Sequence, residues 1–255
     1  MTDLTGRTAL VTGASRGIGR AIAERLAADG ALVAVHYGSN ETAAKETVAA
    51  IEHAGGQAFA VRADLAETAE LDGLFAALRA GLAGRPLDIL VNNAAYIDYT
   101  ATIEGATPEA FDRLFAVNVR APLFVIQRAL PLMPDGGRIV NVSSGVTWFS
   151  TPEVVYGMSK GALNVLTRSL AYTQGRRGIT VNTVSPGITE TDMNGWLTES
   201  ADAARAVAGI TALGRHGQPA DIADAVAFFT SDDGRWVSGQ TLEVNGGLLL
   251  GPPAA

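Results

Sequence analysis

The stretch Thr8–Gly19, TALVTGASRGIG, decides the fold of this chain. It opens with a short apolar run, Thr8–Thr12, and then carries glycines in the spacing G-x-x-x-G-x-G from Gly13 to Gly19. An amphipathic segment, Ile18–Ala28, follows directly. Glycine lets a backbone turn tightly and approach a ligand closely, and the N-terminus of a helix presents free N–H groups to an anion. The stretch therefore predicts a strand, a tight loop and a helix that together hold the pyrophosphate of a dinucleotide, although an ordinary strand–helix turn has a similar pattern.

The same alternation continues along the rest of the chain. Six more short runs have the length of strands, and they are apolar throughout, as in strands buried on both faces of a parallel sheet. They are Leu32–His36, Ala58–Arg62, Ile89–Asn92, Arg138–Val142, Thr180–Val184 and Thr241–Val244. The main amphipathic segments between them are Ala43–His53, Glu67–Ala83, Pro108–Met133, Val155–Gln174 and Asp221–Thr230. This order predicts an α/β fold: a single-domain, doubly wound parallel sheet (Rossmann-like) with helices on both faces.

One segment near the C-terminus departs from the alternation. Asn194–Gly209 follows the predicted strand that ends before Pro186 and Gly187, and it is helical without leading directly to another strand. Open parallel sheets bind ligands outside the carboxyl ends of their strands, so the segment predicts a short helical lid near 194–209 over a substrate. A surface excursion without a role is the alternative. We assign 1–255 to one domain and expect 251–255 to fray.

The composition excludes several classes of protein. Hydrophobic residues make up 47% of the 255 residues and charged residues 18%, whereas disordered chains are poor in apolar residues. The formal net charge of −7 provides no basic field for nucleic acid or anionic lipid. Cysteine is absent and the three histidines lack metal-ligand spacing, so we expect neither a disulfide nor a metal site. Without a signal-peptide stretch or an apolar run approaching roughly 20 residues, we expect a soluble, cytoplasmic protein.

The end of the second predicted strand indicates which dinucleotide binds. NAD-specific sheets place a carboxylate there, roughly 20 residues beyond the glycines, on the ribose 2′-hydroxyl. Here 36–40 reads HYGSN, and Glu41 is the first carboxylate that follows. Arg16, inside the glycine loop, offers its guanidinium to a 2′-phosphate instead, with a solvated loop arginine as the alternative. We therefore expect NADP(H) as the cofactor rather than NAD(H).

A tyrosine and a lysine, Tyr156 and Lys160, lie at the start of a predicted helix with the spacing i, i+4. Residues with this spacing share a helix face, so the phenol and the ammonium can meet the same ligand. A nearby cation favours the phenolate, which makes a tyrosine a workable proton donor and acceptor near neutral pH. Such pairs are usually surface features. However, Lys45 is the only other lysine in the chain, and arginine is the usual basic residue elsewhere, so this pair is a candidate for acid–base chemistry.

Six ordered motifs make the chain similar to the short-chain dehydrogenase/reductase family. They are Thr12–Gly19, Asn92 to Ala95, Asn118, Ser143 with Ser144, Tyr156 with Lys160, and Pro186 with Gly187. The resemblance spans Arg7 to Gly247, and in character it is nearest to NADPH-dependent 3-oxoacyl-carrier-protein reductases and polyketide ketoreductases. It implies reduction of a ketone to a secondary alcohol, with Tyr156 protonating the carbonyl oxygen as hydride arrives from the nicotinamide. It further implies that Lys160 binds the nicotinamide ribose and lowers the pKa of Tyr156, and that Asn118 holds a water linking Lys160 to solvent.

The resemblance also implies a set of cofactor contacts and an assembly. The cofactor contacts are Gly13, Ser15, Arg16, Gly17, Ile18 and Gly19 in the glycine loop, Asp64 and Leu65 at the adenine, Asn92 and Ala94 along the dinucleotide, Tyr156 and Lys160 at the ribose, and Pro186, Gly187, Ile188 and Thr191 towards the nicotinamide end. The family usually forms homotetramers through the segments 108–133 and 155–174 and the last strand.

The serine that bonds the substrate oxygen has two candidates. The usual family spacing before Tyr156 gives Ser143, whereas the position after the strand gives Ser144 with one residue deleted from the following loop. Loop length varies more readily than strand register, so we assign the role to Ser144.

Pro122 follows Asn118 with the spacing i, i+4 and has no N–H. It either leaves the Asn118 carbonyl free to bind water or simply kinks the helix.

Large apolar residues gather in the segments expected to line the substrate pocket, 96–99, 144–155 and 188–208. They are Tyr96, Tyr99, Trp148, Phe149, Met193 and Trp196, in a chain that is only 6% aromatic. They favour a flat polycyclic aromatic polyketide ketone, with another β-keto substrate also fitting, although core or subunit contacts are an alternative role for them. Two other functions stay open: an NAD-dependent dehydrogenase of a sugar or secondary alcohol, and a non-catalytic dinucleotide-sensing protein.

Overall fold

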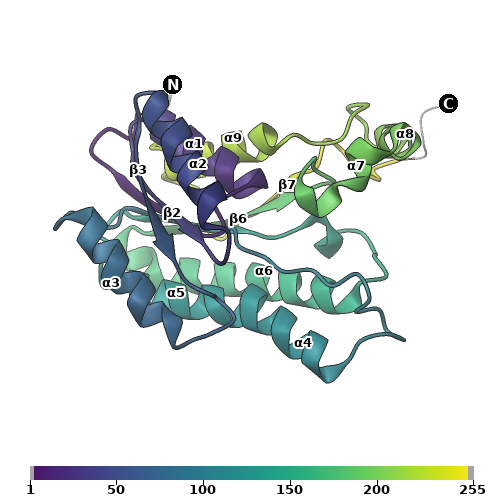
Figure 1. The fold of residues 1–255 in the computed structure, drawn as a ribbon, viewed down its shortest axis with the longest axis horizontal. Helices are drawn as coiled ribbons and strands as arrows, with labels where there is room; N and C mark the ends of the chain where they lie inside the picture. The colour runs from purple at the N-terminus through teal and green to yellow at the C-terminus, as the bar shows by residue number, and fades with distance from the viewer. Residues whose placement is uncertain (1–2, 252–255) are drawn as a thin grey trace.

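Residues 3–251, which the computed structural model describes, contain one seven-stranded parallel sheet with the order β3-β2-β1-β4-β5-β6-β7 (Figure 1). The strands are β1 (Thr8–Val11), β2 (Leu32–Tyr37), β3 (Gln57–Arg62), β4 (Ile89–Asn92), β5 (Arg138–Val142), β6 (Thr180–Pro186) and β7 (Thr241–Val244). Val11 pairs with Val35 on one side and with Val91 on the other. The strand order thus reverses between β1 and β4, where open α/β sheets bind ligands, and the predicted doubly wound sheet is confirmed.

Alternate residues of the strands face opposite layers of helices, which is why the strand sequences are apolar throughout. On β1, Ala9 and Val11 pack in the layer that contains α1 (Gly17–Ala28), α2 (Glu41–His53) and α9 (Pro219–Thr230). Leu10 packs in the other layer, with α3 (Glu70–Leu82) and α5 (Ala121–Ala129), and α6 (Val154–Gln174) borders the same cluster. Figure 1 shows these two layers on either side of the sheet.

The predicted helical segment 108–133 is helical as far as Ala129 and changes to a π-helical turn part of the way along. It consists of α4 (Pro108–Phe115), a π-helical turn (Ala116–Arg120) and α5, which ends at Ala129. Pro122 is buried at the start of α5 and supplies no N–H to the i→i−4 ladder, so the wider turn just before it accommodates the missing hydrogen bond. This turn carries Asn118.

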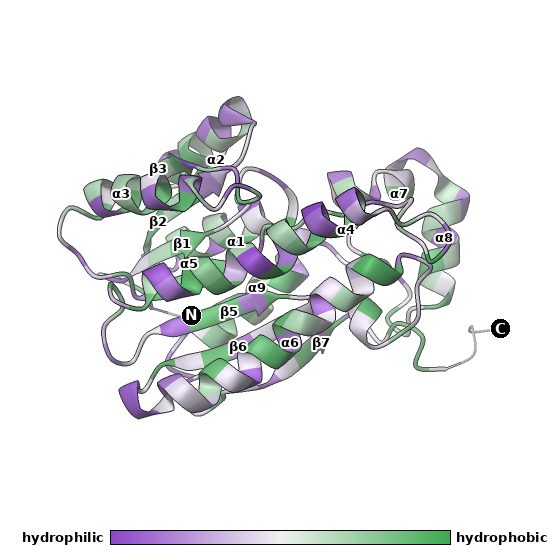
Figure 2. Cartoon of the chain, turned by 90° about the horizontal axis from the view of Figure 1, so that it is seen from below, coloured by the Kyte–Doolittle hydropathy of each residue, from purple (hydrophilic) through white to green (hydrophobic). Residues whose placement is uncertain are grey.

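The predicted helical lid consists of two short helices. They are α7 (Trp196–Glu199) and α8 (Ala201–Gly209), preceded by a 3₁₀ turn at Asp192–Asn194. Ser200 separates them because its backbone is extended, and its Oγ accepts the N–H of Ala203 at 3.2 Å as the N-cap of α8. Figures 1 and 2 show α7 and α8 together at one end of the molecule.

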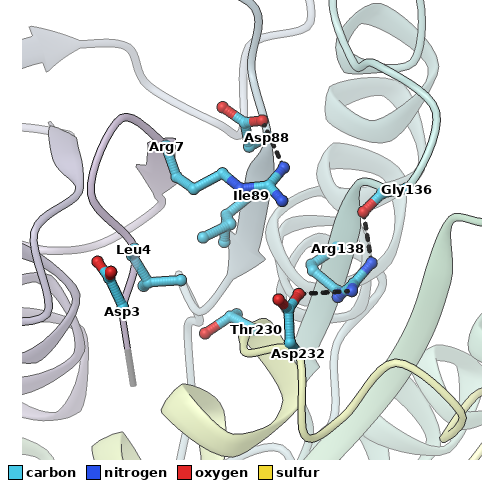
Figure 3. Close-up of a pocket in the computed structure, with 9 residues that line it drawn as sticks. All are labelled: Asp3, Leu4, Arg7, Asp88, Ile89, Gly136, Arg138, Thr230 and Asp232. Atoms are coloured by element: carbon cyan, nitrogen blue, oxygen red, sulfur yellow. Dashed lines mark hydrogen bonds and ion pairs between the residues drawn. The ribbon is translucent and has the colours of Figure 1, made fainter. Parts of the chain in front are cut away.

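A small hollow lies at the amino ends of β4 and β5, opposite the edge of the sheet that carries the glycine loop (Figure 3). Arg7 lies 3.0 Å from Asp88, and Arg138 lies 3.8 Å from Asp232. Both arginines therefore face carboxylates, and the hollow offers no surplus of positive charge to an anion. We assign it a structural role in joining the starts of the strands.

Within residues 3–251, no helix has the length and apolar character needed to cross a membrane. Apart from Gly251, the tail expected to fray at 251–255 lies outside the described residues.

Candidate active site

The glycine loop packs closely against the segment that follows β4. Gly13 has φ +64°, and a Cβ at this residue would lie 2.8 Å from the Cα of Ala94. A Cβ at Gly19 would overlap the carbonyl of Gly13 and the side-chain amide of Asn93. Gly17 also has positive φ, and its space is bounded by the Thr191 side chain. These residues form a tightly packed glycine cradle at the N-terminus of α1, a position typical of pyrophosphate binding, and that role stays a prediction.

Thr12 and Asn93, which were not among the predicted contact residues, join this cradle to the loop after β4. Thr12 Oγ1 accepts the backbone N–H groups of Asn93 at 3.0 Å and Ala94 at 3.1 Å. Asn93 Nδ2 donates back to the carbonyl oxygens of Thr12 at 2.9 Å and Gly13 at 3.1 Å. The only sequence signal was their position beside the glycines and Asn92 in the motifs.

Some predicted cofactor contacts turn their side chains away from the cradle. Asn92 is buried between strands, where its Nδ2 donates to Asn141 Oδ1 at 2.9 Å. Leu65 is buried in the core layer beside α3. The carboxylate of Asp64 accepts the N–H of Ala66 at 2.9 Å within its own turn. Dinucleotide contacts from these residues stay a prediction. Because the side chains of Asn92 and Leu65 are buried in the protein, such contacts would have to come from the backbone of these two residues.

The remaining predicted contacts lie around the glycine loop and the start of the lid. Ser15 accepts a hydrogen bond from Thr47 at its carbonyl, and Ile18 packs against the core. Arg16 Nη1 lies 3.2 Å from Asp192 Oδ2, with both side chains well exposed, so the glycine loop and the turn before the lid are already in contact. Beyond β6, a Cβ at Gly187 would lie 2.8 Å from Asn245, and Ile188 accepts the N–H of Gly217 at 2.9 Å.

Tyr156 and Lys160 lie on the first turns of α6, and both side chains are buried. Lys160 Nζ donates to the carbonyl of Val142 at 2.9 Å and lies 5.7 Å from the centroid of the Tyr156 ring. Burial lowers the pKa of Lys160 to about 8, because an apolar environment disfavours the ammonium. Burial likewise raises the pKa of Tyr156 to about 12, with a hydrogen bond from Ser144 opposing the rise and Tyr99 adding to it.

The expectation that Lys160 lowers the pKa of Tyr156 stays a prediction. Desolvation of the phenol is the largest influence, and Lys160 is not among the groups that shift the pKa of Tyr156. The ammonium lies towards the ring and donates to the Val142 carbonyl. Tyr156 is consequently a protonated phenol at neutral pH.

The two candidate serines have different surroundings. Ser143 is buried, and its Oγ donates to the carbonyl of Lys160 at 3.1 Å. Ser144 is half-buried, lies close enough to Tyr156 to lower the pKa of its phenol, and accepts the N–H of Val146 at 3.4 Å. Ser144, rather than Ser143, is therefore the serine that influences the pKa of the phenol. Its catalytic role stays a prediction.

Alanine variants at the two serines test this assignment. We expect Ser144→Ala to lower kcat about 10²–10³-fold, as does removal of one donor from an oxyanion site. Ser143→Ala loses a bond to the helix backbone, so we expect about 1 kcal/mol less stability and a kcat within about threefold of the wild type. Steady-state rates and urea unfolding of both variants provide the measurement. A larger loss of kcat in Ser143→Ala would reverse the assignment.

Asn118 is fully buried in the π-helical turn and clamps the loop after β4 to α6. Its Oδ1 accepts the N–H of Tyr96 at 2.8 Å, and its Nδ2 donates to the Tyr96 carbonyl at 2.8 Å and to Ser159 Oγ at 3.0 Å. The side chain is therefore fully used in structure. Since Pro122 cannot donate to the Asn118 carbonyl, that carbonyl is the group suited to hold a water, and the relay stays a prediction.

The predicted pocket aromatics divide into packed and exposed residues. Tyr96 packs in a small buried cluster with Val155 and Tyr156. Trp148 is 63% exposed, and Trp196 and Met193 are each 39% exposed. Tyr99 donates its hydroxyl to the carbonyl of Met193 at 2.7 Å, which joins the loop after β4 to the turn before the lid.

Across residues 3–251, no group of three or more His, Cys, Asp or Glu side chains is arranged to hold a metal.

A doubly wound sheet with a glycine loop before α1, and a buried tyrosine and lysine on one face of α6, is typical of a dinucleotide-dependent oxidoreductase. Residues 13–249 match the family described as enoyl-(acyl carrier protein) reductase. AacuN, a short chain dehydrogenase/reductase of Aspergillus aculeatus, is 39% identical over 256 residues, which are 96% of this chain and 96% of the relative. The chain belongs to the short-chain dehydrogenase/reductase family.

Two solved structures are similar to this chain along nearly its whole length. The promiscuous reductase LugOII, which catalyses keto-reduction at C1 during lugdunomycin biosynthesis, is 50% identical with a TM-score of 0.93, covering 98% of this chain and 100% of LugOII. The angucycline C-6 ketoreductase LanV with bound NADP is 49% identical with a TM-score of 0.92, covering 98% of each chain. LanV is also known with NADP and rabelomycin bound. The predicted similarity to polyketide ketoreductases is confirmed.

Proposed function

We propose that this chain is an NADPH-dependent ketoreductase that reduces a ketone of a polycyclic aromatic polyketide to a secondary alcohol. The observation that carries the proposal is the buried pair of Tyr156 and Lys160 on one face of α6, with the Lys160 Nζ 5.7 Å from the centroid of the Tyr156 ring. Burial raises the pKa of Tyr156 to about 12. The phenol therefore carries, at neutral pH, the proton that ketone reduction must deliver to the carbonyl oxygen. Oxidation of an alcohol needs the phenolate, which this environment disfavours.

The residues present fit a nicotinamide dinucleotide, because the lack of a Cβ at Gly13 and Gly19 lets the loop pack against Ala94 and Asn93 at the N-terminus of α1, where helix N–H groups suit a pyrophosphate. When bound, the reduced nicotinamide supplies two electrons and one hydrogen to the carbonyl carbon. Tyr156 donates its O–H proton to the carbonyl oxygen, and Ser144 stabilises the negative charge that develops there. Lys160, with a pKa of about 8, is positioned on the same helix face to return a proton to the phenolate.

The preference for NADPH rests on charge at the ends of the glycine loop and β2. Tyr37 ends β2, no carboxylate follows before Glu41, and Glu41 forms an ion pair with Lys45 at 2.8 Å. Arg16 is exposed, and its ion pair with Asp192 is one that solvent weakens. It can therefore exchange Asp192 for a 2′-phosphate. NADP bound in LanV supports the same cofactor.

The substrate class rests on the large side chains of the segments expected to line the substrate pocket. Trp148 follows the 3₁₀ turn after β5, Met193 lies in the turn before the lid and Trp196 begins α7, and all three present apolar surface to solvent. Tyr99 raises the pKa of Tyr156. Aromatic faces of this kind stack on flat ring systems. LanV with rabelomycin and LugOII in lugdunomycin biosynthesis support an aromatic polyketide ketone.

The proposal is tested by NADPH and NADH oxidation with polycyclic aromatic ketones, quinones and aliphatic β-ketoesters. We expect kcat/KM for the best polycyclic ketone to exceed that of the β-ketoesters at least about tenfold, because stacking area is lost with the aliphatic compounds. We expect NADPH to be preferred over NADH about tenfold or more, since one charged bond to phosphate has this effect.

The matched control is Arg16→Ala, which should lose most of the preference for NADPH while leaving turnover with NADH nearly unchanged. Turnover of a sugar or secondary alcohol with NAD, and none with NADPH and ketones, would establish the dehydrogenase alternative. Tight NADPH binding without turnover of any ketone in the panel would favour the sensing protein.

We also propose that the chain is a cytoplasmic homotetramer. Apolar side chains are exposed on the helices expected at the interfaces, including Leu123 on α5 and Met158, Val165 and Tyr172 on α6, with Tyr172 88% exposed. Burial of such residues between subunits is a common reason for their exposure in a single chain.

A further inference from the structure

His36 is a buried histidine that the mechanism above does not use. It lies on β2, one residue before the strand ends, and pairs in register with Val61 of β3. The side chain is 2% exposed, in a position between the glycine loop and the end of β3. A buried titratable side chain needs hydrogen-bond partners, and both ring nitrogens of His36 have one.

The two hydrogen bonds fix the protonation of the ring. Nδ1 lies 3.0 Å from the backbone N of Gly13, whose N–H is a donor, so Nδ1 must be the unprotonated acceptor. Nε2 lies 3.1 Å from the carbonyl oxygen of Ala63, which only accepts, so Nε2 must carry the proton. Both contacts therefore require the same neutral tautomer.

Burial supports this neutral state by lowering the pKa of His36 to about 4. The carboxylate of Asp64, in the turn after β3, opposes this effect by raising the pKa of His36. Behind Asp64, Glu70 accepts the N–H of Asp64 at 2.7 Å and lies 3.4 Å from Arg62, so its charge is already paired. The ring consequently stays neutral through the physiological pH range.

The partners of His36 are the two ends of the candidate dinucleotide site. Gly13 begins the glycine cradle and has φ +64°, and the next N–H, that of Ala14, donates to the His36 carbonyl at 2.8 Å. His36 therefore holds two consecutive amides of the loop, one with its ring and one with its backbone. On the other side, Ala63 precedes Asp64 and Leu65, the residues expected at the adenine.

We propose that His36 is a positioning residue of the dinucleotide site, in which the imidazole sets the glycine loop against the adenine-side turn through Nδ1 and Nε2. The proposal rests on the proposed NADPH binding. Of the two bonds, the one to Gly13 controls cofactor affinity, because it holds a glycine that has more backbone conformations available than any other residue. Without it the loop is binding-competent for a smaller fraction of the time, and the apparent Kd rises by that fraction.

Two substitutions separate the two bonds. In His36→Asn the amide oxygen takes the place of Nδ1 and retains the acceptor for Gly13, while the bond to Ala63 is lost. In His36→Gln the amide nitrogen takes the place of Nε2 and retains the bond to Ala63, while Gly13 loses its acceptor. We expect the Kd for NADPH, titrated by fluorescence, to rise about tenfold or more in His36→Gln and less than about threefold in His36→Asn.

Urea unfolding without cofactor measures what each bond contributes to the fold alone, and we expect similar midpoints for the two variants because each loses one hydrogen bond. Asp88→Asn is the matched control: it weakens the ion pair with Arg7 at the opposite edge of the sheet, and should lower stability without changing the Kd. Equal rises of Kd in the two His36 variants, or Kd values that follow the urea midpoints across all three variants, would overturn the proposal alone. A wild type that binds no dinucleotide would overturn the proposed function and this inference with it.

A measurement on the wild type decides the matter if His36→Gln does not fold. The chain has three histidines, so imidazole ¹⁵N resonances can be assigned with His53→Gln and His216→Gln. We expect His36 to remain the neutral Nε2–H tautomer from about pH 5.5 to 8, with Nδ1 shifting when NADPH is added. An Nδ1–H tautomer, a titration within this range, or an Nδ1 resonance indifferent to NADPH would overturn the proposal.

Discussion

Tyr156→Phe is expected to lower kcat for ketone reduction by about 10²–10⁴-fold, the range that a positioned general acid contributes. The substitution removes only the phenolic oxygen, and with it the proton that the carbonyl oxygen must receive. The ring still fills its place beside Val155 and Leu114, so the core around the site keeps its packing. The measurement is kcat with saturating NADPH and the best ketone of the panel, together with the Kd for NADPH.

Two controls make the Tyr156→Phe result specific. The Kd for NADPH should stay within about threefold of the wild type, since the cradle of glycines is untouched. Tyr99→Phe removes a phenol at the same entrance, one that donates to the Met193 carbonyl, and should reduce kcat far less. A Tyr156→Phe enzyme that keeps more than about a tenth of the wild-type kcat would show that another group supplies the proton.

The sequence predicts the sheet well because its physical signal is local. Each strand is a short apolar run, and alternate residues such as Ala9 and Leu10 must both be apolar when helices cover both faces. Breaks within helical segments are harder to predict from periodicity. Pro122 signals an interruption, but whether the chain kinks or forms a π-helical turn depends on how Asn118 packs against α6. Ser200, whose extended backbone separates α7 from α8, is a residue type common at helix N-caps. Its presence in the sequence does not show that the segment forms two helices rather than one.

For the candidate site, spacing predicts which residues meet but not how deeply they are buried. The i, i+4 spacing brings Tyr156 and Lys160 together as expected, yet the direction of the tyrosine pKa depends on desolvation, which pattern and composition do not measure. The partners of His36 and Thr12 present a different difficulty, because they are distant in sequence. His36 contacts Gly13 and Ala63, and only the pairing of β2 with β1 and β3 places the three together.

Lys160→Met is expected to abolish most activity and at the same time to stabilise the chain. Burial lowers the pKa of Lys160 from 10.5 to about 8, so below pH 8 the folded state contains an ammonium that is poorly solvated. A shift of this size corresponds to about 3 kcal/mol of free energy. Methionine has a similar length and no charge, and the hydrogen bond to the Val142 carbonyl that is lost contributes about 1 kcal/mol. We therefore expect a net gain of about 2 kcal/mol in the free energy of unfolding at neutral pH.

The gain should depend on pH in a defined direction. Between pH 8 and 10.5 the unfolded state retains the lysine proton while the folded state releases it, so this group makes the wild type more stable as pH rises through that window. Below pH 8 both states hold the proton and the full penalty applies. Urea unfolding of wild type and Lys160→Met across this range should give a difference that is largest below pH 8 and declines towards pH 10.5. A Lys160→Met chain that is less stable than the wild type below pH 8 would mean that the bond to Val142 outweighs desolvation.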